Sequence, residues 1–142
     1  MTVQRLLKGK GAFVPVTHAD ATLEEVIGRL GSDKDFGTLV VTDDEKRLLG
    51  ILSERDIARG LKTYGRDVLE RPVGDLMTRE VATCEVSKPL SAVLELMDKH
   101  NIPHVPITRD GVVCGIIDMH DIVKYRLDAI HAVASALRAP AP

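Results

Sequence analysis

One short pattern occurs twice in this sequence, and it limits the folds open to the chain. The residues at 50–56 read GILSERD, and those at 115–121 read GIIDMHD, 65 residues further on. Each copy has a glycine, two aliphatic residues, a polar residue, two variable residues and an aspartate. An apolar run that ends at a polar residue before an amphipathic segment predicts a buried strand leading into a helix. Each aspartate then falls in the first turn of a helix, near N–H groups that favour anions.

The segments around the two copies also follow one order. In the first half we expect a strand, a helix, two strands and a helix, at residues 13–16, 23–30, 38–42, 48–52 and 54–62. In the second half the same order is expected at residues 81–84, 90–97, 104–107, 112–117 and 119–137. The predicted fold is therefore α/β (α+β), with two β-α-β-β-α units. A unit of about 60 residues buries little surface alone, so the units should pack about a pseudo-two-fold axis, face to face or edge to edge.

These patterns predict a lead-in and first unit at residues 1–63, a linker at 64–76, and a second unit with an extended C-terminal helix at 77–142. The linker is assigned because Gly65, Pro72 and Gly74 stand there among charges. Residues 1–11 fit either a solvated turn or a flexible basic arm that approaches a phosphate. The apolar positions of the last helix fit either packing on its own unit or contact with a second subunit.

Composition excludes several classes of function. Hydrophobic residues make up 44% and charged residues 28%, which is typical of a soluble globular protein. A formal charge of −2 and 3% aromatic residues do not suit a nucleic-acid partner. With no signal peptide and no apolar run near 18 residues, we expect a cytoplasmic protein with no membrane contact. The five histidines lack metal-site spacing, the two cysteines are expected to be buried free thiols, and no catalytic motif is present, so neither a metal nor an enzyme is expected.

Together these features resemble a tandem pair of CBS domains, the small regulatory module named after cystathionine β-synthase. The resemblance rests on the two repeated motifs, on DLMT at 75–78 and on IPHVPI at 102–107, and it covers residues 13–127. It implies a disc-like pair of units with two clefts that bind adenine nucleotides such as AMP, ATP or NAD(H). The nucleotide would be a regulatory ligand, and no catalytic cofactor is implied. Because no catalytic domain accompanies the pair, the chain is similar to the stand-alone CBS-pair proteins of bacteria.

The resemblance also implies that each cleft is built across the repeats. The stronger cleft would combine residues from both units: Ser53, Arg55, Asp56, Thr83, Lys88, Ile102, Pro103 and His104. The weaker cleft would combine the others: Thr17, Thr22, Gly37, Thr38, Asp118 and Asp121.

The residue types in the stronger cleft suit a nucleotide. Asp56 accepts hydrogen bonds and matches the two ribose hydroxyls, while Ser53 and the helix N-terminus can bind ribose or phosphate. Arg55 is a planar donor suited to phosphate oxygens. Each residue also has a structural alternative. Asp56 could only stabilise the first turn of its helix by its charge, Arg55 could be an ordinary surface residue, and His104 could only pack against its neighbours.

The weaker cleft departs from the pattern. Asp118 stands where the first motif has Ser53, and His120 stands where it has Arg55. Two carboxylates beside a phosphate repel it, so we expect this cleft to bind phosphates weakly or to take a nucleoside-like ligand.

The sequence therefore predicts a non-catalytic, homodimeric sensor of adenine nucleotides, of the energy-sensing kind, that acts on an unidentified regulated protein. The alternative is a dimerising scaffold or interaction protein with vestigial clefts.

Overall fold

The computed structural model describes residues 1–11, 14–31 and 37–138 and contains the two predicted units. Repeat 1 consists of β1 (Val16–Thr17), α2 (Leu23–Leu30), β2 (Thr38–Thr42), β3 (Leu48–Ser53) and α3 (Glu54–Tyr64). Repeat 2 consists of β4 (Cys84–Glu85), α5 (Leu90–His100), β5 (His104–Arg109), β6 (Val112–Asp118) and α6 (Met119–Arg138). The predicted fold class is confirmed.

Both repeats build the same three-stranded sheet. The strand orders are β1-β2-β3 and β4-β5-β6, and in each sheet the first pair is parallel and the second antiparallel. All five residues of β2 are buried, as expected for a central strand covered on both faces. Helix α2 begins with a capping box between Thr22 and Glu25, and its apolar spacing buries Leu23, Val26 and Leu30.

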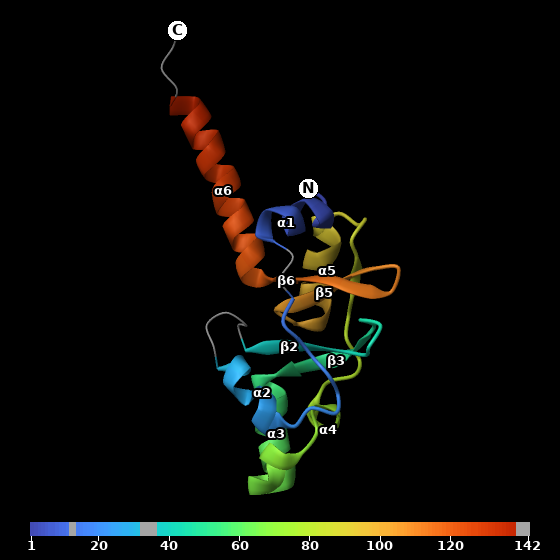
Figure 1. The fold of residues 1–142 in the computed structure, drawn as a ribbon. Coiled ribbons are helices and arrows are strands. Elements are labelled where there is room, and N and C mark those ends of the chain that lie inside the picture. The colour runs from blue at the N-terminus through green and yellow to red at the C-terminus, as the bar shows by residue number, and fades with distance from the viewer. Residues whose placement is uncertain (12–13, 32–36, 139–142) are drawn as a thin grey trace.

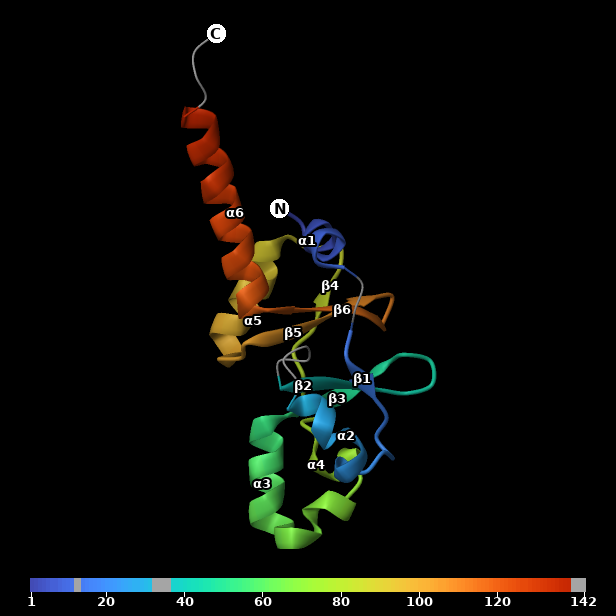
Figure 2. The same ribbon diagram turned by 60° about the vertical axis from the view of Figure 1, so that its left-hand side comes forward.

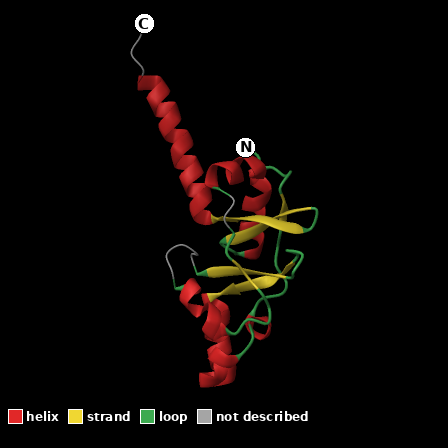
Figure 3. Ribbon diagram, in the orientation of Figure 1, coloured by secondary structure: helices red, strands yellow, loops and turns green. Residues whose placement is uncertain are grey.

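The two sheets stack face to face, and the helices cover their outer sides (Figures 1 and 3). A small cluster of Val40, Val113 and Ile116 joins the sheets. A larger core lies between each sheet and its own helices. The view in Figure 2 shows the same four layers from another side, with α6 running away from the body of the molecule.

The segment that precedes each repeat packs on the other repeat. Helix α1 (Val3–Lys10) comes before repeat 1, but its Val3 and Leu6 are buried in the core of repeat 2. The 3-10 helix η1 (Gly65–Glu70) and helix α4 (Val73–Leu76) come before repeat 2, but they complete the core of repeat 1. Residues 1–11 thus form a docked helix instead of a solvated turn or flexible arm.

Two motif glycines allow this crossed packing. A Cβ at Gly50 would lie 2.6 Å from the Thr78 carbonyl oxygen, and a Cβ at Gly115 would lie 2.8 Å from Leu7. The segment before repeat 2 therefore approaches β3 at Gly50, and α1 approaches β6 at Gly115. At either position a side chain would obstruct the contact.

The first strand of each repeat differs from the prediction. Strand β1 is Val16–Thr17, whereas 13–16 was expected, and Phe13 lies outside the described residues. Strand β4 is Cys84–Glu85, whereas 81–84 was expected. Residues before β4 are drawn toward repeat 1, because Thr78 exchanges two backbone hydrogen bonds with Ile51, of 2.8 and 2.9 Å.

Helix α6 leaves a row of apolar side chains exposed. We call these residues the α6 stripe: Met119, Val123, Leu127, Ile130, Val133 and Leu137, with exposed fractions from 43 to 82%. Ile122, near the start of the helix, is buried in the core of repeat 2. Beyond its first turns, the helix projects past the body of the protein (Figure 1).

Candidate nucleotide-binding cleft

The first motif places a buried carboxylate where β3 becomes α3. Asp56 is 2% exposed, although charged side chains are seldom buried without partners. Its Oδ2 accepts hydrogen bonds from the Ser53 backbone N–H (2.8 Å) and from Ser53 Oγ (3.1 Å). These bonds fix the orientation of the carboxylate at the helix N-terminus.

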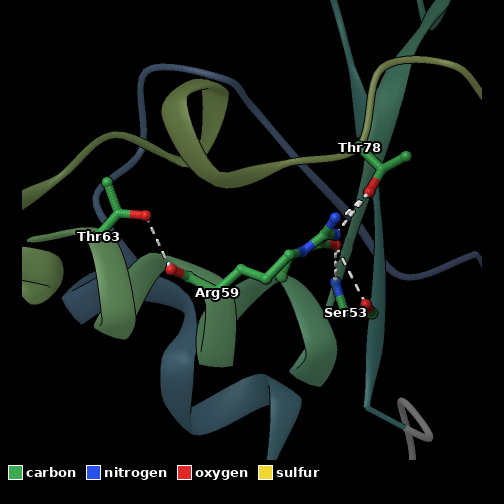
Figure 4. A network of polar contacts seen from close by, with 5 residues as sticks. Ser53, Arg59, Thr63 and Thr78 are labelled. Carbon is green, nitrogen blue, oxygen red and sulfur yellow. Dashed lines mark hydrogen bonds and ion pairs between the residues drawn. The ribbon is translucent and has the colours of Figure 1, made fainter.

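The other oxygen of Asp56 faces two different partners. Oδ1 accepts a hydrogen bond of 2.7 Å from Thr78 Oγ1 and forms an ion pair with Arg59. Figure 4 shows the labelled side chains of Arg59 and Thr78 close to Ser53, at the start of α3. The Arg59 side chain is 64% exposed and that of Asp56 is 1% exposed, so the arginine reaches inward from solvent. An exposed arginine can be exchanged for another donor, such as a ribose hydroxyl, more readily than Ser53 or Thr78 can.

A cavity of 620 Å³ opens beside this carboxylate, within the range typical of small-molecule sites. Its floor and walls come from both repeats and from the segment between them. The lining residues that the predicted clefts did not include are Ile51, Glu54, Arg59, Thr78, Glu80, Val81, Ala82, His100 and Asn101. A second hollow of 480 Å³ shares four lining residues with this cavity, Asp56, Arg59, Thr78 and Glu80, so these residues stand between the two hollows.

Six of the eight residues predicted for the stronger cleft line this one cavity: Ser53, Arg55, Asp56, Ile102, Pro103 and His104. Thr83 and Lys88 are exposed and do not appear among its lining residues. Gly37 and Thr38, which were assigned to the weaker cleft, also line this cavity.

His104 and Thr38 connect the two repeats inside the cavity. Thr38 Oγ1 lies 3.5 Å from His104 Nδ1, and each residue stands at the beginning of the middle strand of its sheet. Burial lowers the pKa of His104 from its ordinary value, and the nearby Asp118 carboxylate acts in the opposite direction. A neutral imidazole at this position can accept a hydrogen bond as well as donate one.

The second motif has a different set of partners. Asp121 Oδ2 accepts the Asp118 backbone N–H at 2.9 Å, and Asp118 Oδ1 accepts the Asp121 backbone N–H at 2.8 Å. Lys10 from α1 forms an ion pair with Asp121 and also donates to the Ile116 carbonyl oxygen. Both carboxylates of this motif are therefore engaged within the protein.

Two further residues assigned to the weaker cleft have structural contacts in repeat 1. Thr17 is buried in β1, where it pairs with Val41. Thr22 caps α2 and forms an isolated bridge with Pro72.

The sequence interpretation missed Arg59, Thr78 and Lys10. Arg59 follows Asp56 by three residues, a spacing at which helical side chains meet, so the sequence alone could have predicted this ion pair. Thr78 and Lys10 act from segments that precede the opposite repeat, and no local spacing indicates such contacts.

Within residues 1–11, 14–31 and 37–138, no group of three or more His, Cys, Asp or Glu side chains is placed to hold a metal ion. No helix among these residues combines the length and apolarity needed to cross a bilayer. Both cysteines are free, Cys84 buried and Cys114 half-buried, and burial raises the pKa of both thiols.

This architecture matches that of known proteins. The CBS-domain profile matches residues 13–63 and 73–128. An uncharacterized 17.7 kDa protein of Acidianus ambivalens is 29% identical over 116 residues, which are 81% of this chain and 68% of that protein. The chain spans only 34–35% of the length of some other curated relatives.

Two solved structures are close in fold. A CBS-domain protein of Agrobacterium tumefaciens, ATU1752, is 33% identical with a TM-score of 0.79, covering 89% of this chain and 99% of that one. The CBS-domain pair of protein MJ0100, solved with 5′-methylthioadenosine and S-adenosyl-L-methionine, is 25% identical with a TM-score of 0.76, covering 91% of this chain and 98% of that one. The repeated motif, the stacked sheets and the profile match agree, and the chain belongs to the CBS-domain family as a pair of CBS domains.

Proposed function

We propose that this protein is a non-catalytic regulatory module that binds an adenine nucleotide, of the AMP, ATP or NAD(H) type, in the 620 Å³ cavity. The observation that carries the proposal is the position of Asp56. A buried, oriented carboxylate stands at a helix N-terminus on the wall of a cavity that both repeats build. Vicinal ribose hydroxyls are the ligand groups that such a carboxylate recognises. The adenosine-type ligands of MJ0100 support this ligand class.

Each part of the nucleotide has a candidate partner in the cavity. The ribose would take the place of Arg59 on Asp56 Oδ1, while Ser53 and Thr78 keep the carboxylate oriented. The adenine ring would lie against Ile102, whose side chain is half-buried. This residue follows the C-terminus of α5, and its backbone N–H donates to the Met97 carbonyl oxygen of that helix. The phosphate would meet the exposed Arg55 near the N-terminus of α3.

We infer that the protein also forms a homodimer through the α6 stripe. Six large apolar side chains in one row leave a face that a second copy can cover symmetrically. Binding of a nucleotide between the repeats can then change the relative position of the two sheets, and a regulated partner protein can sense this change.

The test is calorimetric titration of AMP, ADP, ATP, NAD and NADH into the wild type, Asp56→Ala and a matched variant, Asp98→Ala. Asp98 is an exposed carboxylate on α5 and does not line the cavity. We expect at least one nucleotide to bind the wild type and Asp98→Ala equally and Asp56→Ala much more weakly. No binding by the wild type would leave the dimerising scaffold as the function.

A thermal-unfolding series gives a second readout. A ligand that binds only the native state at a hundredfold excess over its Kd stabilises the protein by about 2.7 kcal/mol. Comparing the increase in Tm caused by the ligand, rather than Tm itself, separates lost binding from any loss of stability in Asp56→Ala.

A further inference from the structure

Lys10 contacts the second motif at two atoms. Its Nζ lies 2.6 Å from Asp121 Oδ2 and 2.6 Å from the Ile116 carbonyl oxygen. The two side chains of the ion pair are only 24% and 14% exposed, so water screens this pair less than a pair on the open surface. A compact ammonium group with three donors suits two acceptors at this distance.

In repeat 1 the corresponding carbonyl and carboxylate have a different partner. There the Ile51 carbonyl oxygen accepts the Thr78 backbone N–H at 2.8 Å, and Asp56 accepts the Thr78 hydroxyl at 2.7 Å. Ile51 and Ile116 hold the same place in the two motifs, as do Asp56 and Asp121. One lysine side chain therefore bonds both the carbonyl and the carboxylate that Thr78 bonds in repeat 1, and it adds a positive charge that Thr78 lacks. On Asp121 it bonds Oδ2, the oxygen that also accepts the Asp118 backbone N–H, whereas Thr78 bonds the other oxygen of Asp56.

Helix α1 holds Lys10 in this position. Val3 and Leu6 are buried in repeat 2, and Leu7 packs against Gly115 in the motif itself. Backbone hydrogen bonds join Val3 to Lys88 (3.1 Å) and Met1 to Leu90 (3.0 Å). The lysine is thus presented by a docked helix and not by a freely moving chain end.

We propose that Lys10 is an internal ligand of the second motif and prevents it from binding a nucleoside. The inference rests on the proposed function, because it assigns Asp121 the ribose-recognising chemistry of Asp56. A ribose diol must compete with a charge-assisted bond from a lysine that the fold holds in place. At Asp56 it competes instead with the exposed Arg59. Each chain therefore takes one nucleotide, in the first cleft.

Removal of Lys10 has a specific consequence for the ligand class. Asp118 and Asp121 then stand together without the ammonium group, and their charge repels a phosphate. The released motif should admit an uncharged adenine nucleoside but not AMP. The test is calorimetric titration of adenosine and of AMP, with the number of sites as the readout. It uses the wild type, Lys10→Met, Lys10→Met/Asp121→Asn and, as a matched control, Lys8→Met, which alters an exposed lysine of the same helix.

We expect Lys10→Met to bind one more adenosine per chain than the wild type and the same number of AMP molecules. The added site should be absent from Lys8→Met and from the double variant. An unchanged adenosine count in Lys10→Met overturns the inference, and so does a tenfold loss of AMP affinity, which would make Lys10 a phosphate ligand. Failure of the proposed function has a different signature, since the wild type would then bind neither ligand.

Discussion

Replacing Ile130 by aspartate tests the dimer that the α6 stripe implies. Ile130 is 62% exposed in the single chain. Complete burial of such a side chain contributes about 1.5–3 kcal/mol, so covering the exposed part contributes about 1–2 kcal/mol per chain. In a two-fold dimer the residue occurs twice, and Ile130→Asp should cost about 2–4 kcal/mol of association free energy. That cost raises the dimer Kd by a factor of between about 30 and several hundred.

The matched control is Ser135→Asp. Ser135 is exposed on the same helix and lies about 140° around its axis from Ile130. The control adds the same charge and a similar loss of helix propensity, but away from the stripe. Sedimentation equilibrium over a dilution series measures the Kd of all three proteins.

We expect the wild type and Ser135→Asp to dimerise alike and Ile130→Asp to dissociate at much higher concentration. Equal Kd values for Ile130→Asp and the wild type would show that the stripe is not the interface. A wild type that stays monomeric at micromolar concentration would remove the dimer altogether.

Three further predictions concern the cleft. Asp56→Ala should weaken AMP binding by more than Asp121→Ala, because losing a charge-assisted bond at the binding carboxylate costs about 1.5–3 kcal/mol; equal losses in calorimetry would reverse the ranking of the motifs. Arg55→Ala should reduce the affinity for AMP but not for adenosine, with partial rescue in Arg55→Lys, and parallel losses for both ligands would exclude a phosphate role. Because burial lowers the pKa of His104, protons bind the unfolded chain more tightly, so wild-type stability should fall as the pH drops below about 6.5. In His104→Gln the urea midpoint should fall less steeply with decreasing pH than in the wild type. An equally steep fall in both proteins would show that His104 is not the cause.

The sequence predicts the features that depend on neighbours within one repeat. Helix α2 was readable from Thr22, Glu25 and the apolar spacing after them, because capping and amphipathic periodicity are local. That the two units pack together follows from the fact that neither small unit can bury its apolar face alone, whereas the sequence left face-to-face and edge-to-edge packing open. The position of Asp56 in the first turn of α3 follows from the motif itself.

What the sequence does not indicate are contacts that cross between repeats. The lead-in before repeat 1 carries a helical apolar spacing too short to interpret alone, and the core on which it packs begins more than seventy residues later, at Cys84. The assignment of Thr38 to the weaker cleft has the same origin. Thr38 and His104 lie 3.5 Å apart at the contact between the units, and their distance depends on how the sheets stack.

The crossed packing of α1 has a consequence for how the protein is made. The helix is synthesised before repeat 1, yet the core that its Val3 and Leu6 complete requires β5 and β6, which are synthesised after repeat 1. During translation the apolar face of α1 therefore stays without its partner core while repeat 1 emerges from the ribosome. Repeat 1 can close earlier, since α4 follows it directly in the chain. A chain that starts at residue 13, where the family match begins, would lack this helix and would leave a hole in the opposite repeat.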